Sequence, residues 1–267
     1  MRIRFMGLVA VALPLALAAE DSTARAAPAS SVAAPEDSTV AHTLRLLTET
    51  AHHPYLTWPD YPHYRDEMEG LYEPGGYGLL WFEGGMPKSQ ARAAVAALAG
   101  ADAHALNPGD YDAGQLQELL TEIAGGREVD GSELALVDAA ISVAFLRFLS
   151  DMHIGRVNPQ NLSFGFNVED RKLDLAAVVR AAIRSDQILE TVARVEPKFP
   201  QYDRMQEALA EYRELATREL PSLPDGTTVH PGDEYPATGD LRALLIALGD
   251  LGADTAPSGA EYDGELV

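Results

Sequence analysis

The rest of the chain is organised around the apolar pattern of the segment 134–159. One side carries apolar residues at spacings of three and four, and the opposite side carries a second apolar strip, with Leu134, Val137, Ile141, Phe145, Phe148, Leu149 and Met152 on the first side and Leu136, Val143 and Leu146 on the second. This pattern predicts a helix over about 134–154 that is buried nearly all round. Asp138 and Arg147 interrupt the apolar run before it reaches the roughly 20 residues of a membrane span, so a core helix is the better interpretation.

The residues next to the predicted helices indicate where they begin and end. Gly155 can adopt a left-handed conformation that closes the central helix, and Pro159 prevents its continuation. Ser132 is a candidate N-cap for this helix, and Ser89 is a candidate N-cap for an alanine-rich helix further upstream.

Amphipathic patterns on both sides of the central segment predict further helices, and the pattern over 202–216 is the cleanest of them. They lie near 44–51, 65–72, 90–99, 116–123, 174–184, 188–195, 202–216 and 241–248, while the brief apolar run 77–82 favours an extended segment. Few β-branched runs occur, and helix-forming residues dominate. We therefore expect an all-α protein, an irregular multi-helix bundle around the buried helix at about 134–154.

The N-terminus has the layout of a secretory signal peptide. Arg2 and Arg4 precede a short apolar run that is followed by small residues, so we expect residues 1–26 to be cleaved and the protein to be exported to the periplasm. Retention of the apolar run as an uncleaved anchor is the alternative. No transmembrane span is expected after cleavage.

The remaining chain divides by composition. Residues 27–39 are rich in alanine, serine and proline and predict a flexible leader, and a Pro/Gly/Asp-rich stretch predicts a linker near the C-terminus. The expected units are a helical domain at 40–220, the linker at 221–236 and an exit helix at 237–252.

Charge and cysteine content exclude several classes of function. The net charge is -21 and no segment concentrates lysine and arginine, so we expect no nucleic-acid partner. The sequence has no cysteine, which rules out disulfides and a cysteine nucleophile in this chain. No cofactor is expected.

A few histidines and acids have spacings that resemble a metal site. His63 and Glu67 stand at helical spacing near His52 and His53, which is a set that could bind zinc. The prolines in this stretch break the helix that such a pair needs, so we expect no metal site. His153 is better placed to interact with the end of the central helix than to act in catalysis.

Pairs of carboxylates could act as the acid and base of a glycosidase. Asp66 with Glu69, and Glu118 with Glu122, are such pairs, and a carboxylate-dependent glycan hydrolase is therefore an alternative function. Because 41 acidic residues make chance pairs common, a solvated helix face is the favoured interpretation.

Arg156 is the polar residue that stands out at the end of the central helix. Its guanidinium can satisfy carbonyls at the helix end or pair with a carboxylate such as Asp151, and a structural role is favoured over ligand binding. Tyr202, Tyr212 and Trp81 are expected to be core aromatics whose polar atoms find partners.

These segments together resemble the scaffold domain of the large periplasmic murein L,D-transpeptidases. In that family the central helix ends in a D-x-x-x-G-R-V-D/N-P pattern, followed by a P-x-x-P-x-Y helix with a Y-R pair; the matching residues here are Asp151, Gly155, Arg156, Asn158, Pro159, Tyr202, Tyr212 and Arg213. The family's H-G-L-x-P-x-D-Y turn resembles the segment 104–111, in which Ala105 replaces the usual glycine. The resemblance covers about 43–267.

The resemblance implies a scaffold followed by a peptidoglycan-binding module and a catalytic domain with a cysteine nucleophile. Residues 262–267 resemble the opening of that module, so we expect 253–267 to be its truncated start. Because the chain has no cysteine, we expect it to be no enzyme as it stands. The implied function is that of a non-catalytic scaffold in peptidoglycan cross-linking or remodelling, with peptidoglycan or cell-wall enzymes as partners. A wall- or protein-binding module without chemistry is a further alternative, and the chain is either a fragment or a separate protein.

Overall fold

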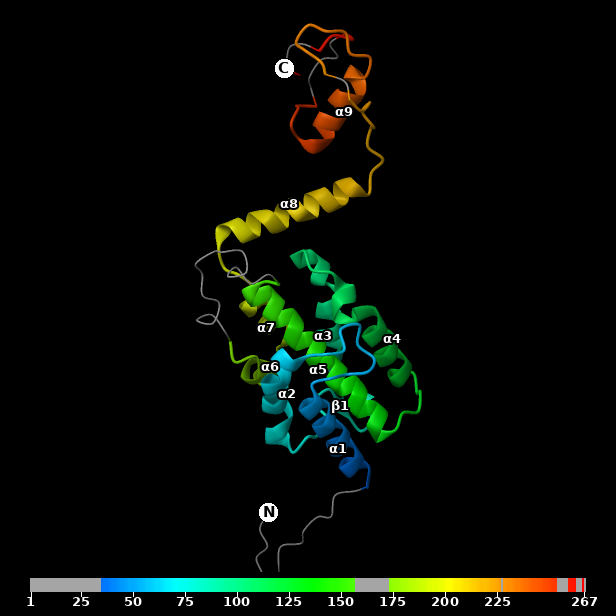
Figure 1. The fold of residues 1–267 in the computed structure, drawn as a ribbon, viewed down its shortest axis with the longest axis vertical. Coiled ribbons are helices and arrows are strands. Elements are labelled where there is room, and N and C mark those ends of the chain that lie inside the picture. Colours follow the sequence, from blue (N-terminus) through cyan, green and yellow to red (C-terminus); the bar gives the residue numbers. More distant parts are fainter. Residues whose placement is uncertain (1–34, 157–172, 227, 254–258, 263–265, 267) are drawn as a thin grey trace, which may run out of the picture. The chain divides into compact units, whose positions relative to one another are not determined.

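The central apolar segment forms one helix, α5 (Gly131–Ile154), as predicted. The computed structural model describes residues 35–156, 173–226, 228–253, 259–262 and 266 (Figure 1). The expected signal peptide, Asn158 and Pro159 lie outside these ranges. Residues around the whole circumference of α5 are buried, and Ala135, Ile141, Phe145 and Leu149 have no exposed surface.

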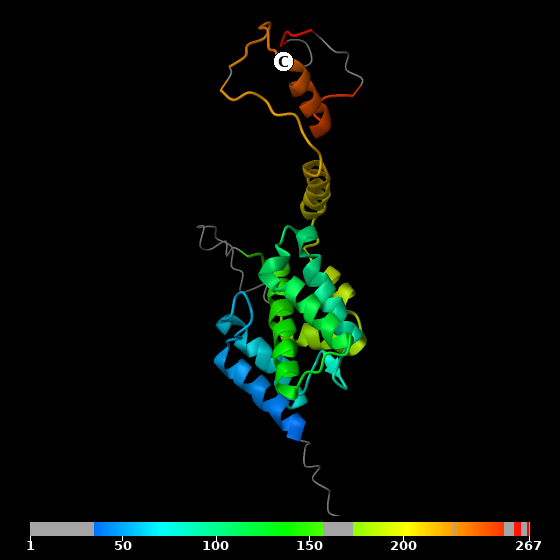
Figure 2. The ribbon, with the colours of Figure 1, turned by 90° about the vertical axis from the view of Figure 1, so that its right-hand side faces the viewer.

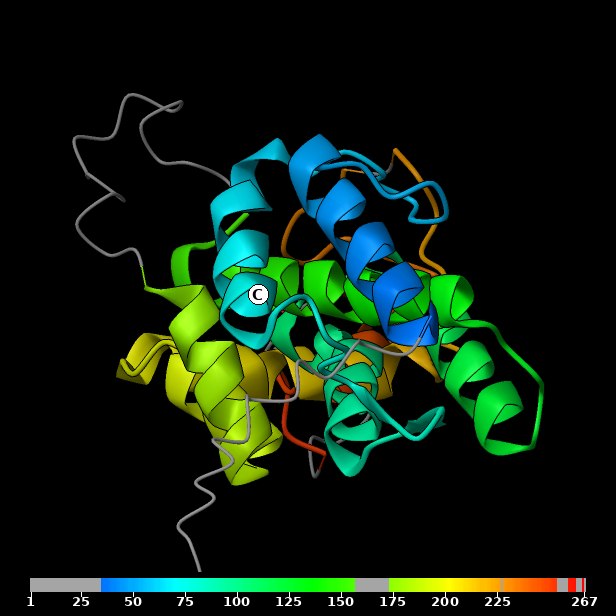
Figure 3. The same ribbon diagram turned by 90° about the horizontal axis from the view of Figure 1, so that it is seen from below.

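Helix α5 is buried because other helices pack on several of its sides. Its neighbours are α1 (Pro35–Thr50), α2 (Arg65–Tyr72), α3 (Ser89–Ala99), α4 (Ala113–Ala124), α6 (Leu175–Ser185) and α7 (Ile188–Val195). Figure 2 shows α5 between α1 on one side and the pair α3 and α4 on the other, and Figure 3 shows α1 and α2 side by side against it. The all-α bundle around a central buried helix is therefore confirmed.

Shorter elements connect these helices. They are the 3₁₀ helices η1 (Pro62–Tyr64), η2 (Glu73–Gly75), η3 (Ala101–His104) and η4 (Pro108–Tyr111), and the strands β1 (Phe82–Glu83) and β2 (Met86–Pro87). The strands pair antiparallel with Phe82 opposite Pro87, and Gly84 and Gly85 between them both have positive φ, which a tight two-residue hairpin turn requires. Sequence analysis anticipated extended structure near Phe82 but not the hairpin. The C-terminal helices are α8 (Pro200–Ala216) and α9 (Thr238–Leu248).

Three predicted helix starts were wrong. Helix α1 begins at Pro35, inside the segment 27–39 that we expected to be a flexible leader, because proline is well tolerated in a first helical turn. Helix α5 is capped by Asp130, whose carboxylate accepts from Glu133 N at 2.8 Å, and Ser132 already lies within the helix. Ser89 is likewise the first residue of α3, not its cap.

A chain of buried polar side chains joins α5 to the irregular segment before β1. Trp81 Nε1 donates to Ser142 Oγ at 2.8 Å, the Ser142 and Tyr72 hydroxyl oxygens lie 2.7 Å apart, and Tyr72 donates to Asp138 Oδ1 at 2.7 Å. Because Tyr72 gives its single proton to Asp138, Ser142 is the donor to Tyr72. Trp81 is thus a core aromatic with an indole partner, as predicted.

Asp138 ends this chain as a fully buried acceptor. It also accepts from Leu80 N at 3.2 Å and from Trp81 N at 2.8 Å. Burial raises the pKa of Asp138 to about 6, although the hydrogen bonds from Tyr72, Trp81 and Leu80 lower it. The residue that interrupts the apolar periodicity therefore fixes a loop to the core.

Helix α8 is less buried than its amphipathic pattern suggested. No described residue of α8 is buried, and the side chains of Met205 and Tyr212 are 71% and 61% exposed. The prediction that Tyr212 is a core aromatic was wrong, because periodicity shows which residues share a helix face but not whether another element covers that face.

The described residues include no helix long and apolar enough to cross a membrane. Helix α5 has the length, but it carries Asp138 and Arg147 as the sequence indicated.

Candidate functional site

Two segments that carry the family resemblance meet at the C-terminal end of α5. Tyr111 in η4 donates to Asp151 Oδ2 at 2.7 Å. Arg156 Nη1 donates to Asp110 Oδ2 at 2.5 Å, and Arg156 Nε lies 3.7 Å from Asp151 Oδ2. The predicted pairing of Arg156 with Asp151 is present, and Asp110 is its closer partner. We call these four residues the motif junction.

Local backbone geometry brings the motif junction together. Asn107 Oδ1 accepts from Gly109 N at 3.0 Å and starts η4, which places Asp110 and Tyr111 beside α5. Gly155 has φ 90°, a conformation that favours glycine, and it ends α5 just before Arg156. The glycine expected to close the helix therefore also sets the direction of the chain at Arg156.

The electrostatics of the motif junction favour a structural link. Burial raises the pKa of Asp151, while the hydrogen bond from Tyr111 and the charge of Arg156 lower it. The hydrogen bond to Asp110 raises the pKa of Arg156. The four side chains thus pair with one another and hold η4 against the end of α5.

The other predicted motif residues lie on α8. The Tyr202 hydroxyl lies 3.1 Å from His104 Nδ1 and accepts from Gln206 Nε2 at 3.1 Å. Burial raises the pKa of Tyr202 to about 12, with Glu196 nearby contributing in the same direction. Arg213 Nη1 lies 3.4 Å from Asp102 Oδ2, so both ends of η3 interact with α8.

Two of the histidines weighed as a zinc site, His52 and His53, have other partners. His52 Nδ1 lies 2.8 Å from Asp60 Oδ1, and His53 Nε2 lies 2.9 Å from Leu136 O. His153 Nδ1 is 3.2 Å from Val195 O, which links α5 to α7. In the part of the chain that the structure describes, no three histidine, cysteine or acidic side chains are grouped as metal ligands.

The acid pairs considered for glycan hydrolysis lie on exposed surface. Asp66 and Glu69 are exposed on α2, and Glu118 and Glu122 are exposed on α4. Neither pair lines the groove described next.

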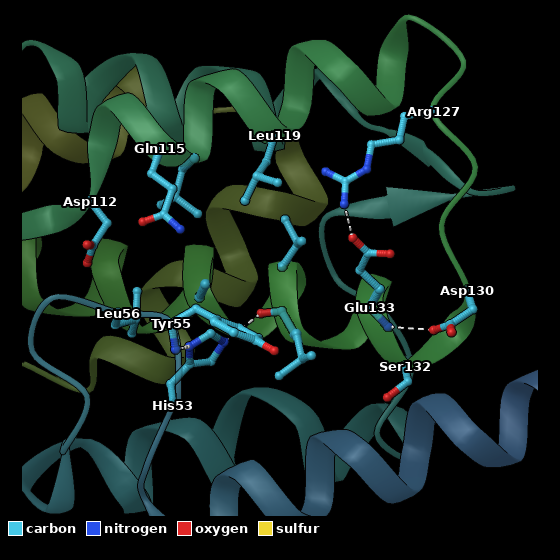
Figure 4. A pocket seen from close by; sticks show the side chains of 14 residues that line it. His53, Tyr55, Leu56, Asp112, Gln115, Leu119, Arg127, Asp130, Ser132 and Glu133 are labelled. Carbon is cyan, nitrogen blue, oxygen red and sulfur yellow. Dashed lines mark hydrogen bonds and ion pairs between the residues drawn. The ribbon is translucent and has the colours of Figure 1, made fainter.

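A groove of about 510 Å³ lies between α4, α5 and the loop 51–61 (Figure 4). Its apolar walls are formed by Leu56, Leu116, Leu119, Leu136, Val137 and Ala140, and its polar residues are His53, Tyr55, Asp112, Gln115, Arg127, Asp130, Ser132 and Glu133. We call this the loop groove. An apolar cleft with a few converging polar groups is the usual form of a ligand site.

Backbone and side-chain contacts hold the loop 51–61 in place. Tyr61 N donates to Ala51 O at 2.8 Å, and His53 N donates to Pro59 O at 2.8 Å. The loop nevertheless exposes two aromatic side chains, Tyr55 at 64% and Trp58 at 54%. Since exposed aromatics add nothing to the core, a fixed loop that presents them is typical of a binding surface.

His53 anchors this loop in its neutral form. Burial lowers the pKa of His53, in spite of the hydrogen bond to Leu136 O, which raises it. Because a carbonyl can only accept, His53 Nε2 carries the proton, and Nδ1 accepts from Tyr55 N at 3.3 Å. Both ring nitrogens are therefore used to hold the loop on α5.

Asp112 closes one end of the loop groove. Its Oδ1 accepts from Thr57 N at 3.0 Å and from Thr57 Oγ1 at 2.6 Å. The side chain is buried, at 7% exposure, and among the described residues Oδ2 has no hydrogen-bond partner. Asp112 also has φ 53°, the left-handed region that aspartate and asparagine tolerate better than most residues.

At the other end of the groove, Arg127 is already paired. It binds Glu122 at 2.8 Å and also contacts Glu133, while Asp130 caps α5. Sequence analysis missed the loop groove because its residues come from three separate segments and follow no spacing rule. Two features of the sequence could have indicated the groove. They are the aromatic residues Tyr55 and Trp58 in a proline-rich stretch, and Asp112 directly after the turn at 107–111.

A family model described as Scaffold domain matches residues 66–209 of the chain. The match spans more than half of the sequence and includes the motif junction, α4 and α5, whereas the loop 51–61 precedes it. No curated protein matches the chain, and no solved structure does.

Proposed function

Because the chain belongs to the Scaffold domain family, we propose that it acts as a non-catalytic scaffold in peptidoglycan cross-linking or remodelling. Cross-linking itself is then performed by other domains or by partner enzymes that this chain positions. The resemblance of the sequence to the murein L,D-transpeptidases supports this role, since most of its motifs fall within the matched residues.

The observation that carries the proposal is the motif junction. Tyr111 and Asp151 are separated by 40 positions in the sequence, yet they are hydrogen-bonded, and Arg156 joins Asp110 beside them. Residues of two family motifs therefore serve one purpose, which is to fix η4 to the end of the central helix. Side chains that are paired with one another suit a role in positioning structural elements better than a role in catalysis.

The proposal also includes export to the periplasm and the absence of enzymatic activity in this chain. The arginines and short apolar run of the N-terminus support export. The lack of any cysteine supports the absence of acyl-transfer activity through a thiol.

Two experiments test this function. Purified protein incubated with muropeptide tetrapeptides should form no cross-linked product by mass spectrometry, and product formation would refute the non-catalytic role. Deletion of the gene in the native host should lower the fraction of cross-linked muropeptides, and the wild-type gene should restore it. An unchanged muropeptide profile in the deletion strain would contradict a role in the wall.

A binding module without chemistry is the second candidate, and the loop groove is the observation that favours it. The groove is bordered by a fixed loop with exposed Tyr55, and it contains the buried acceptor Asp112. Retention of the purified chain on isolated sacculi, or of a partner protein on the chain, distinguishes wall binding from protein binding.

A further inference from the structure

We propose that the loop groove binds a primary ammonium group on an aliphatic stem, as in a lysine side chain of a partner protein. The ammonium pairs with the Asp112 carboxylate, and the stem lies along the leucines of α4 and α5. This inference concerns ligand recognition and does not depend on a role in peptidoglycan cross-linking.

One oxygen of the buried Asp112 carboxylate has no hydrogen-bond partner among the described residues. A buried carboxylate oxygen without a donor costs free energy, and native proteins retain such atoms where a ligand or water supplies the missing bond. Both bonds from Thr57 go to Oδ1, so Oδ2 is left as an acceptor without a partner among the described residues. The ligand that completes this site must donate a hydrogen bond.

The charge of the groove is negative. Three carboxylates and one guanidinium line the groove, namely Asp112, Asp130, Glu133 and Arg127. The guanidinium already binds Glu133 and, outside the groove, Glu122, so no cation among the residues that line the groove pairs with Asp112. Arg147, whose charge also acts on Asp112, does not line the groove and donates to Asp60 O. The groove therefore attracts a cation and disfavours an anion, and a cationic donor makes a stronger bond to a carboxylate than a neutral hydroxyl does.

The lining of the groove suits an alkyl chain. The walls next to Asp112 include Leu56, Leu116 and Leu119, which suit an alkyl stem but leave a compact hydrated cation without further oxygen ligands. Tyr55 stands at the mouth with most of its ring exposed, where an aromatic face can attract an approaching ammonium group.

Asp112 is reached from the side of Gln115. Figure 4 shows Gln115 beside Asp112 on α4, and its side chain is exposed. Because Oδ2 of Asp112 is buried, entry of the ligand needs a side-chain movement at this end of the groove, whereas the loop stays fixed by His53 and Thr57. The ligand thus enters a largely preformed site, which reduces the entropy lost on binding.

The test compares two short capped peptides, each with a central residue between two leucines. One carries lysine and the other carries Nε-acetyl-lysine, which keeps the stem but removes the charge. Isothermal titration calorimetry with the full chain should show about tenfold or more tighter binding of the lysine peptide.

Asp112→Asn is the matched variant. Asparagine is well suited to the left-handed backbone at this position, and it keeps one oxygen to accept both bonds from Thr57. We expect Asp112→Asn to bind the two peptides with equal affinity. Glu118→Gln removes the same charge from exposed surface on α4 outside the groove, and it should retain the preference for lysine.

Each other outcome overturns the proposal. Equal affinity of the two peptides for the wild-type chain would show that no carboxylate selects the ammonium, and no binding at all would indicate that a buried water satisfies Asp112 instead. A preference that persists in Asp112→Asn would place the ammonium elsewhere. Thermal unfolding of each variant distinguishes a lost contact from a lost fold.

Discussion

The buried carboxyl of Asp138 should make the stability of the fold depend on pH. Its pKa is raised from the ordinary value of 3.8 to about 6 by burial. Between these two values the folded protein binds more protons than the unfolded chain, so the contribution of this group to the free energy of unfolding falls as pH rises. A pKa difference of this size corresponds to roughly 3 kcal/mol between about pH 4 and pH 7.

Asp138→Asn removes this dependence and keeps the shape of the side chain. The amide places an NH₂ group against one of the backbone donors Leu80 N and Trp81 N, which costs about 1–3 kcal/mol at any pH. In the wild-type protein, the contribution of Asp138 to the free energy of unfolding falls as its carboxyl ionises. The stability difference between wild type and variant should therefore be about 3 kcal/mol smaller at pH 7 than at pH 4.

Urea denaturation followed by circular dichroism at a series of pH values measures this difference. Because the other titrating groups are common to both proteins, their contributions cancel. Glu118→Gln, at an exposed position of α4, serves as the control and should run parallel to wild type. A difference between wild type and Asp138→Asn that is constant with pH, or that grows as pH rises, would refute the assigned cause.

Three further predictions concern backbone strain, the motif junction and the core. Ala105 is exposed with φ 60°, so Ala105→Gly should raise the free energy of unfolding by roughly 1 kcal/mol, whereas Ala103→Gly in η3 should lower it. Tyr111→Phe removes the bond to Asp151 and should cost about 1 kcal/mol in urea denaturation. Phe145→Ala, at a fully buried position, should cost about 3–5 kcal/mol, and a thermal shift of only a degree or two would contradict the central place of α5.

The helices of this protein were largely predictable because their apolar residues recur at helical spacing. The prediction was best where burial is complete, as in α5, since the apolar positions on all sides of that helix then pack in the core. It was poorer at helix ends, where Asp130 and not Ser132 provides the cap, because several neighbouring residues can fill that position. The expected burial of Tyr212 failed because the periodicity of α8 does not show how far other elements cover its face, and Tyr212 remains 61% exposed.

The candidate sites were predictable only in part, and the reason is sequence separation. The pairing of Arg156 with Asp151 could be anticipated because both lie at one helix end. Their contact with the turn at 107–111 brings together residues that sequence spacing alone leaves unconnected. The loop groove was invisible for the same reason, since Asp112 and Thr57 are 55 positions apart and neither belongs to a periodic pattern.

Polar contacts explain how a mostly apolar helix can position irregular segments. Three of them tie such segments to α5: His53 to Leu136, Trp81 to Asp138 and Tyr111 to Asp151. Each lies on a different stretch of the helix, so a change at one contact should alter its own segment more than the others. The first of these contacts, together with the bonds from Thr57 to Asp112, determines the shape of the loop groove. The central helix therefore helps to position the loop 51–61 through the carbonyl of Leu136, while its side chains form the core and part of the groove wall.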